Sequence, residues 1–397
     1  MSSTIVLGAG IVGISTALAL QARGLDVLVI DRKAPGQETS FGNAGVIQNE
    51  ARAPYAFPRA PLTLLTYALG RSNDVIFDLP ALPGMANALA QYFWQSAPRR
   101  HADISRHYAE LVAQATSDHA ALITASGAEH LLCKSGLGEI FTNQKAFEAR
   151  ALEAEQFGKT HELAMTTVDG TQIAAEEGLT KAPAGAVLWR DTWHVRDPGA
   201  LVTAYAKHFI RNGGRVEQAD ITALSPAGSA WKVNTTSISY DAKHVVVALG
   251  PWSPNLLAPL GYRIPMVMKR GYHAHYNHET ELSRPYLFAQ EGLVLSSMNA
   301  GLRVTTGAHL TDFDRPQKLH QLKAGLKAIS GYISLTDRVP EQQWHGTRPC
   351  LPGMLPLVGP APKHQGLWFN FGHGHQGLTL GPTTGKRLAA LFELAAD

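Results

Sequence analysis

The residues best suited to bind a ligand stand near the start of the chain, in the run Gly8-Ala9-Gly10-Ile11-Val12-Gly13. Gly8 permits a tight turn, Gly10 lets the backbone approach a pyrophosphate group, and Gly13 allows a helix to pack closely on a strand. The first turn of such a helix offers unpaired N–H groups and a positive dipole end to phosphate oxygens. Asp31 lies eighteen residues after Gly13, where a carboxylate accepts hydrogen bonds from a ribose. This spacing predicts a dinucleotide-binding site.

The segments around this glycine turn are the ones that such a site needs. Residues 3–7 are predicted to form a buried strand, residues 14–22 continue as an apolar helix, and residues 26–30 form a second buried strand that ends on Asp31. Strand, turn, helix and strand in this order make a βαβ unit. We therefore expect an α/β domain with a Rossmann-like fold.

Two further glycine-rich segments indicate which dinucleotide is bound. Residues 39–45 follow the second strand almost at once, where a nicotinamide enzyme normally begins a helical crossover. Residues 370–379 form another glycine-rich turn before a helix predicted at 382–396, and its N–H groups are suited to a flavin pyrimidine ring that gains negative charge on reduction. Glycine clusters at opposite ends of the chain suggest a long ligand held from both sides, which favours FAD over NAD.

These segments resemble the glycine oxidase and D-amino-acid oxidase family of flavoproteins, and within it the bacterial D-amino-acid dehydrogenases of the small-subunit type. The resemblance is dense at residues 8–13 with Asp31, and at residues 39–45, 53–58, 245–253 and 346–378. Its most specific part is Arg348-Pro349 followed by Gly372-His373-x-x-x-Gly377-Leu378. It implies a discontinuous FAD-binding domain at 1–80, 190–265 and 345–397. It also implies an antiparallel-sheet substrate-binding domain at 81–189 and 266–344.

The glycine turns and the resemblance together imply cofactor contacts from five parts of the chain. They are Gly8, Gly10, Ile11, Val12 and Gly13; Asp31 and Arg32; Thr39, Ser40, Asn43, Ala44, Gly45 and Val46; Ala248, Gly250 and Trp252; and Gly372, His373, Gly374, His375, Gln376, Gly377, Leu378 and Thr379. We expect noncovalent FAD, because Cys350 has a different offset from the turn than the flavin-linked cysteine of the related sarcosine oxidases. The His-Gly-His run lacks carboxylate or cysteine partners, so we expect no metal site.

Four residues are candidates for contact with substrate. Arg348 matches the family position that anchors a carboxylate, for which a planar guanidinium is suited. Tyr272 matches a tyrosine that faces the substrate, with a buried core tyrosine as the alternative. Tyr55 lies in a segment that matches a lid over the active site, with an ordinary surface loop as the alternative. His375 falls at a position that can face the substrate in relatives.

The reaction that these residues imply is oxidation of a D-amino acid at Cα, with a hydride passing to flavin N5. No strong base is needed if the amine binds neutral, so orientation carries much of the catalysis. The product is an imino acid, which hydrolyses to a 2-oxo acid. From D-proline or hydroxy-D-proline the imino acid is cyclic and remains as a pyrroline carboxylate. A glycine or sarcosine oxidase that makes hydrogen peroxide, or a noncatalytic flavin subunit of a larger complex, is the alternative. The electron acceptor stays open among a quinone, a dye-like acceptor and oxygen.

Composition limits the class of protein. The 397 residues are 45% hydrophobic and 17% charged, which is ordinary for a globular chain. A net charge of +3 is too small to indicate a nucleic-acid surface. The two cysteines form no disulfide or metal motif, which favours a reducing compartment. We therefore expect a cytoplasmic protein, with peripheral contact at the inner membrane face or with a partner subunit left open.

The remaining elements follow from hydrophobic periodicity. Helices are predicted at 62–69, 83–95, 104–125, 198–212 and 319–332, and strands at 130–133, 137–141, 215–217, 245–248, 271–276, 293–295 and 303–305.

Overall fold

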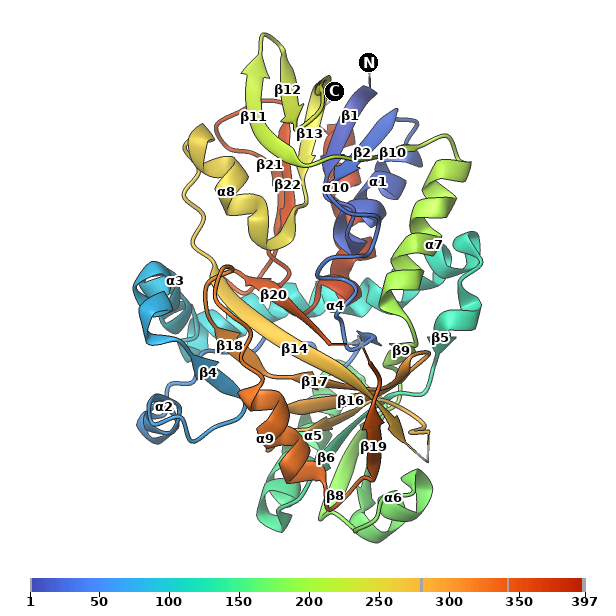
Figure 1. Ribbon diagram of the computed structural model, residues 1–397, viewed down its shortest axis with the longest axis vertical. Helices are drawn as coiled ribbons and strands as arrows, with labels where there is room; N and C mark the ends of the chain where they lie inside the picture. The colour runs from blue at the N-terminus through green and yellow to red at the C-terminus, as the bar shows by residue number, and fades with distance from the viewer. Residues whose placement is uncertain (1, 279–280, 341–342, 395–397) are drawn as a thin grey trace.

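Two large β-sheets organise the molecule and lie one above the other in Figure 1. The computed structural model describes residues 2–278, 281–340 and 343–394. The first sheet runs in the order β10 (Arg215–Gln218), β2 (Val27–Asp31), β1 (Ser2–Leu7), β13 (Ser239–Val247), β12 (Ala230–Thr235) and β11 (Ile221–Ala227), and β22 (Leu367–Phe371) and β21 (Leu357–Pro360) extend from β13.

The centre of the first sheet is parallel and buried on both faces. β1 lies between β2 and β13, and all three run in the same direction. One face packs against α1 (Ile11–Gln21), α4 (Pro98–Ser126), α7 (Pro198–Arg211) and α10 (Gly377–Leu394). On the other face, α8 (Ser253–Leu257) and side chains of β11 and β12, the antiparallel strands of the same sheet, share a core with the parallel strands. Continuous apolar strands are what a parallel sheet covered on both faces requires. The predicted βαβ unit is confirmed.

The second sheet is mainly antiparallel. It runs in the order β4 (Val75–Phe77), β18 (Ala308–Leu310), β14 (Val267–His278), β17 (Gly301–Thr306), β16 (Leu293–Met298), β15 (Tyr286–Phe288), β6 (Leu137–Phe141), β8 (Gly185–Trp189) and β7 (Met165–Asp169), and β19 (Leu335–Arg338) and β20 (Trp344–Cys350) also pair with β14. A small third sheet joins β3 (Val46–Ile47), β9 (Trp193–Val195) and β5 (Leu132–Cys133).

Helices that do not cover the first sheet complete the fold. They are α2 (Pro61–Ala68), α3 (Leu82–Gln95), α5 (Gln144–His161), α6 (Gly170–Glu177) and α9 (His320–Ile329), with short 3-10 turns at Leu79–Ala81, Glu129–Leu131, Gly250–Trp252 and Ala258–Leu260. The Rossmann-like cofactor fold with an antiparallel second sheet is confirmed. The predicted domain boundaries stay a prediction, although β4 and β20 both lie in the second sheet rather than in the first.

Most predicted helices and strands are present with small shifts at their ends. The helix predicted at 198–212 is α7, and Asp197 caps it by accepting a hydrogen bond from Ala200 N at 2.9 Å. The sequence predicts a strand at 130–133. The first two of these residues belong to a 3-10 turn, and only Leu132–Cys133 form a strand, β5. The sequence reasoning did not identify α5, α6, β7 or β8.

The C-terminal helix begins earlier than predicted. α10 starts at Gly377 rather than at 382, and Pro382 lies inside it; residues 395–396 of the prediction lie outside the described residues. A proline has no N–H to offer the carbonyl four residues earlier, which here is Leu378 O. His119 Nε2 lies 2.7 Å from that oxygen, and Tyr205 Oη lies 3.0 Å from His119 Nδ1. Burial lowers the pKa of His119 to about 4, so the ring is neutral and donates one hydrogen bond while accepting the other.

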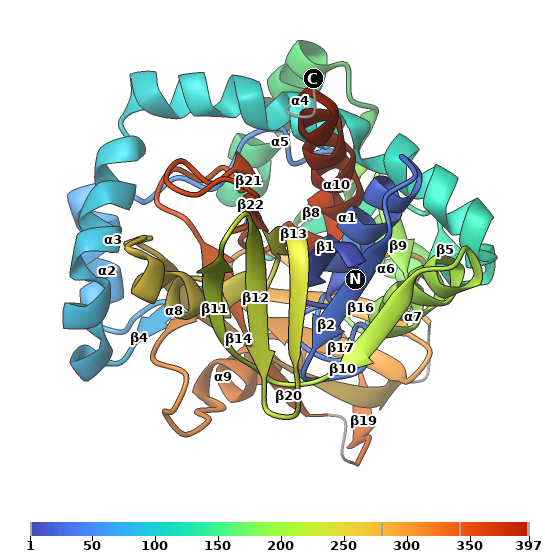
Figure 2. The same cartoon turned by 90° about the horizontal axis from the view of Figure 1, so that it is seen from above.

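α10 packs directly against α1, and the two helices lie side by side in both views (Figure 1 and Figure 2). Two glycines of α10 make this approach close. A Cβ atom at Gly385 would lie 2.9 Å from the carbonyl carbon of Ser15, and one at Gly381 would lie 3.1 Å from Ile11 Cγ1. α10 therefore holds the helix that begins at the glycine turn.

We expect Gly385→Ala to lower the free energy of unfolding by about 1–3 kcal/mol, because the added methyl group meets the backbone of α1. Urea denaturation measures this change. Gly84→Ala is the matched control, since Gly84 lies in α3 with no atom near its missing Cβ, and there alanine should stabilise by about 0.5–1 kcal/mol. Equal effects of both substitutions would contradict the packing argument.

Candidate functional site

A cavity of 1080 Å³ lies between the two large sheets. Gly8, Gly10 and Asp31 line it where β1 and β2 end, and Lys269 and Arg348 line it from β14 and β20. Both glycine clusters found in the sequence border this one space. A single long ligand can therefore touch the first sheet with one end and the second sheet with the other.

The glycine turn has the geometry of a phosphate cradle. Gly8 has φ +111°, and a Cβ atom there would lie 2.5 Å from Ala248 O. A Cβ atom at Gly13 would lie 1.8 Å from Gly8 O, so α1 sits on the strand only because residue 13 has no side chain. Asp31 Oδ2 accepts a hydrogen bond from Ala9 N at 2.6 Å, and burial raises the pKa of Asp31. These residues fit a bound dinucleotide, with the phosphates at the start of α1 and a ribose at Asp31.

Of the residues predicted to contact the cofactor, all but four line the cavity. Those that line it are Gly8, Gly10, Ile11, Val12, Asp31, Arg32, Thr39, Ser40, Asn43, Ala44, Val46, Ala248, Gly250, Trp252, Gly372, His373, Gly374, His375, Gly377 and Leu378. The four that do not line it lie one layer behind. Gly13 and Gly45 allow close approach of neighbouring backbone, Gln376 donates to Gln48 Oε1 at 2.5 Å, and Thr379 Oγ1 accepts from Gln48 N at 3.2 Å.

The two histidines of the C-terminal turn are neutral at neutral pH. His373 is buried against α10 with its Nε2 atom 2.9 Å from Thr384 Oγ1, and burial lowers its pKa to about 3. Burial, followed by the charges of Arg348 and Lys269, lowers the pKa of His375 to about 3. In the described ranges no group of three acidic, cysteine or histidine side chains could hold a metal ion.

Arg348 is held in a fixed position beside the cavity. Its Nη1 atom donates to Gly307 O at 2.8 Å, and its Nη2 atom donates to Thr306 O at 3.0 Å. A Cβ atom at Gly271 would lie 2.6 Å from Nη2, so the guanidinium uses the space that this glycine leaves open. Five N–H groups belong to a guanidinium, and the two bonds to backbone carbonyls leave donors for an anion in the cavity.

Tyr272 does not meet Arg348. Tyr272 pairs with His345 in the register of β14 and β20, whereas Lys269 pairs with Arg348, and alternate residues of a strand point to opposite faces. The Tyr272 hydroxyl lies instead 2.8 Å from His309 Nδ1, and its side chain is fully buried. Tyr272 lines the cavity, but its hydroxyl is held by His309, so its predicted contact with the substrate stays a prediction.

Tyr55 borders the cavity beside His375. The two ring centres are 5.1 Å apart, and the Tyr55 side chain is 65% exposed. The segment is fastened to α3, because Phe57 N donates to Ser96 Oγ at 2.8 Å and the Tyr92 hydroxyl donates to Tyr55 O at 2.5 Å. An exposed aromatic ring on an anchored backbone is suited to cover a ligand, so the lid stays our interpretation of this segment.

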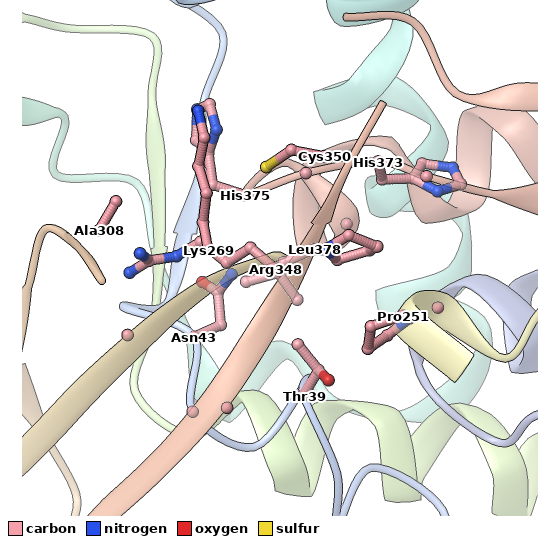
Figure 3. A pocket seen from close by; sticks show the side chains of 18 of the residues that line it. Thr39, Asn43, Pro251, Lys269, Ala308, Arg348, Cys350, His373, His375 and Leu378 are labelled. Atoms are coloured by element: carbon pink, nitrogen blue, oxygen red, sulfur yellow. The ribbon is translucent and has the colours of Figure 1, made fainter. Parts of the chain in front are cut away.

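Sequence reasoning missed Lys269, Tyr92 and Trp344. Lys269 Nζ lies 4.7 Å from the centre of the Tyr92 ring. In Figure 3, Lys269, Arg348, Cys350 and His375 lie together on one side of the pocket, and Thr39 and Pro251 lie on another. One feature of the sequence could have indicated Lys269. It lies two residues before Gly271 in the same strand, so both residues belong to the same face.

Trp344 fills a gap that two glycines leave. A Cβ atom at Gly42 would lie 1.7 Å from its ring, and one at Gly346 would lie 2.0 Å from it. The ring also stacks on His273, with the two ring centres 5.3 Å apart. This indole joins the loop at residues 39–45 to β20 and is part of the cavity lining.

Comparisons with known proteins agree with this geometry. Residues 3–391 match the FAD dependent oxidoreductase family. The chain is 27% identical over 403 residues to a D-amino-acid oxidase of Bradyrhizobium diazoefficiens (98% of this chain, 94% of the relative). It is 28% identical over 415 residues to a D-amino acid dehydrogenase of Cereibacter sphaeroides (98% and 91%).

Solved structures show the same fold. Glycine oxidase from Bacillus cereus superposes with a TM-score of 0.72 at 18% identity, and the alignment covers all of this chain and 96% of that one. L-proline dehydrogenase from P. horikoshii gives a TM-score of 0.72 at 14% identity, with 99% and 94% covered. The phosphate cradle, the long cavity and the match over nearly the whole length lead to one conclusion: this chain belongs to the FAD dependent oxidoreductase family.

Proposed function

We propose that the protein oxidises a D-amino acid at Cα with noncovalent FAD. The observation that carries this proposal is the position of Arg348, which lies in the same cavity as the dinucleotide turn. Two backbone carbonyls orient its guanidinium, and donors remain for a carboxylate. The names of the two relatives support an amino acid as the ligand and the D configuration as its stereochemistry.

The reaction needs little from acid or base groups. When bound, FAD supplies the acceptor for the hydride that leaves Cα. Arg348 holds the carboxylate and thereby orients the Cα–H bond. The amine nitrogen donates its lone pair as the C=N bond forms and its N–H proton is released. His375 is neutral, so it adds no charge that would compete with Arg348 for the carboxylate. Water then converts the imino acid to a 2-oxo acid and ammonia.

We propose a compact ring as the shape of the substrate. Part of the cavity lining is formed by apolar side chains, which are Phe57, Leu64, Val75, Phe77, Leu82, Leu89 and Leu310. Such walls suit D-proline or hydroxy-D-proline, whose imine would remain as a pyrroline carboxylate. A glycine- or sarcosine-type oxidase is the second candidate, and rapid hydrogen peroxide production under air distinguishes it. A noncatalytic flavin subunit is the third, and the fixed carboxylate anchor argues against it.

We expect Arg348→Met to retain bound FAD and to lose substrate reduction, at a cost of about 2–5 kcal/mol in kcat/KM. Anaerobic mixing with a panel of D-amino acids, D-prolines and glycine derivatives, read by the loss of flavin absorbance, measures this effect. If the variant bleached as fast as the wild type, the anchor would lie elsewhere. If no compound bleached the wild type, the proposed function itself would be wrong.

Gly271→Ala tests the position of the anchor without removing its charge. The added methyl group would meet Arg348 Nη2, so we expect the guanidinium to shift and KM for the amino acid to rise at least about tenfold, by analogy with small displacements in active sites. Steady-state kinetics measure this change. Gly331→Ala is the control, because no atom lies near the missing Cβ of Gly331. A normal KM in Gly271→Ala would show that this glycine does not position the anchor.

We also propose peripheral contact with the inner membrane face through α2 and α3. The chain has no helix within the described residues that is long and apolar enough to cross a membrane. α2 buries none of its residues, and large apolar side chains are exposed here; they are Leu62, Leu65, Leu69, Leu79, Phe93 and Trp94. Arg59 and Arg100 lie over the Phe93 and Trp94 rings, which suits anionic lipids.

Leu64 and Tyr67 of the same α2 helix line the cavity, so a lipid-soluble quinone would reach it from this side. We expect Leu62→Glu/Leu65→Glu to abolish flotation with vesicles that contain anionic lipid, while substrate reduction of the flavin stays normal. Leu152→Glu is the control, because Leu152 is 70% exposed on the distant helix α5. Absence of flotation by the wild type would favour a partner subunit on this surface instead.

A further inference from the structure

We propose that Lys269 causes the substrate amine to bind in its neutral form. The Lys269 ammonium is a second cation in the pocket beside Arg348, and the single negative charge of the substrate carboxylate does not compensate both. The inference rests on the proposed function, since it concerns the amino group of the same ligand. It gives a role to a residue that neither the glycine motifs nor the carboxylate anchor accounts for.

The position of Lys269 follows from the sheet. Lys269 of β14 is the direct partner of Arg348 in β20, so both side chains leave the same face. Both residues line the cavity (Figure 3). The Lys269 ammonium lies 4.7 Å from the centre of the Tyr92 ring, a cation–π contact that holds the charge inside the pocket without neutralising it.

Few acidic groups surround these two cations. The titratable groups that face them are Cys350 from β20, Tyr92 from α3, Tyr67 from α2, Tyr55 and His375 from the loops, and Asp74 before β4. Within the part of the chain that the structure describes, neither Lys269 nor Arg348 has a carboxylate oxygen within 4.0 Å. Asp74 lines the cavity but accepts a hydrogen bond from the Tyr67 hydroxyl at 3.1 Å.

His375 shows that both cations act on the same point. Burial is the main reason that its pKa falls to about 3, and the charges of Arg348 and Lys269 lower it further. A second basic nitrogen placed beside His375 would experience the same two charges. We place the substrate amine in this part of the cavity, because Arg348 and His375 line it together.

The charges in the occupied pocket then favour loss of a proton. The substrate carboxylate pairs with Arg348 and compensates one of the two cations. Lys269 remains, and it repels an ammonium group but not a neutral amine. At an effective dielectric constant of about 20, repulsion by one uncompensated cation in the same pocket lowers the pKa of the bound amine by about one to two units. The neutral amine is the form whose lone pair the oxidation requires.

Proton release on binding tests the proposal without any turnover. The ligand is 2-aminoisobutyrate, an amino acid that has no hydrogen on Cα and so cannot be oxidised. Calorimetric titration of the FAD-loaded enzyme at pH 9, in two buffers of different ionisation enthalpy, gives the number of protons released per ligand bound. We expect the wild type to release more than half a proton, and Lys269→Met to release less than half as much.

Two variants serve as controls, one that keeps the charge at residue 269 and one that removes a lysine elsewhere. Lys269→Arg keeps the cation and should release protons as the wild type does. Lys232→Met removes an exposed lysine of β12, far from the cavity, and should change nothing. The pH profile of anaerobic flavin reduction by a reactive D-amino acid gives a second readout. Its apparent pKa should rise by about one to two units in Lys269→Met and stay unchanged in Lys269→Arg.

Equal proton release by the wild type and Lys269→Met would overturn the proposal. Weaker ligand binding in Lys269→Met with unchanged proton release would also overturn it, and would make Lys269 a second carboxylate anchor. The proposed function fails separately, if no D-amino acid or D-proline bleaches the wild-type flavin. If Lys269→Met does not retain FAD, Lys269→Gln provides the same loss of charge in a polar side chain.

Discussion

The close approach of α1 to the ends of β1 and β13 is the constraint on which the rest of the structure depends. Gly8 and Gly13 leave no room for a side chain, so the start of α1 sits directly above the strands. This brings the N–H groups of the helix to one end of the cavity. α10 then packs on α1 through Gly381 and Gly385, and the turn that carries His373 and His375 leads directly into α10. One packing arrangement thus positions both glycine clusters.

A buried histidine makes this arrangement compatible with a proline. Pro382 leaves the carbonyl of Leu378 without its helical partner, and a buried carbonyl without a partner is costly. His119 of α4 supplies the missing donor and is itself oriented by Tyr205 of α7. Three helices that are distant in sequence therefore meet at the start of α10, next to the turn that borders the cavity.

The opposite end of the cavity is governed by charge. Arg348 and Lys269 lie on one face of the second sheet, and His375 is neutral because desolvation and, after it, the two cations disfavour a further positive charge. Glycine again provides the space, since Gly271 lets the guanidinium lie against β14 where two carbonyls orient it. The pocket is thus prepared for an anion before any ligand enters.

The sequence by itself determined the βαβ unit and the dinucleotide-binding site. Local spacing is enough for these features, because the glycines, the apolar strands and Asp31 act within a short stretch. The role of Arg348 as a carboxylate anchor came from the family resemblance and stays a prediction. Only the tertiary structure decided which side chains share the substrate pocket. Tyr272 and Lys269 are three residues apart, and the pairing of β14 with β20 sends one away from Arg348 and the other toward it. Periodicity shows that the side chains of a strand alternate between two faces. Which face meets the ligand depends on neighbouring strands that are distant in sequence, so the strand's own residues cannot reveal it.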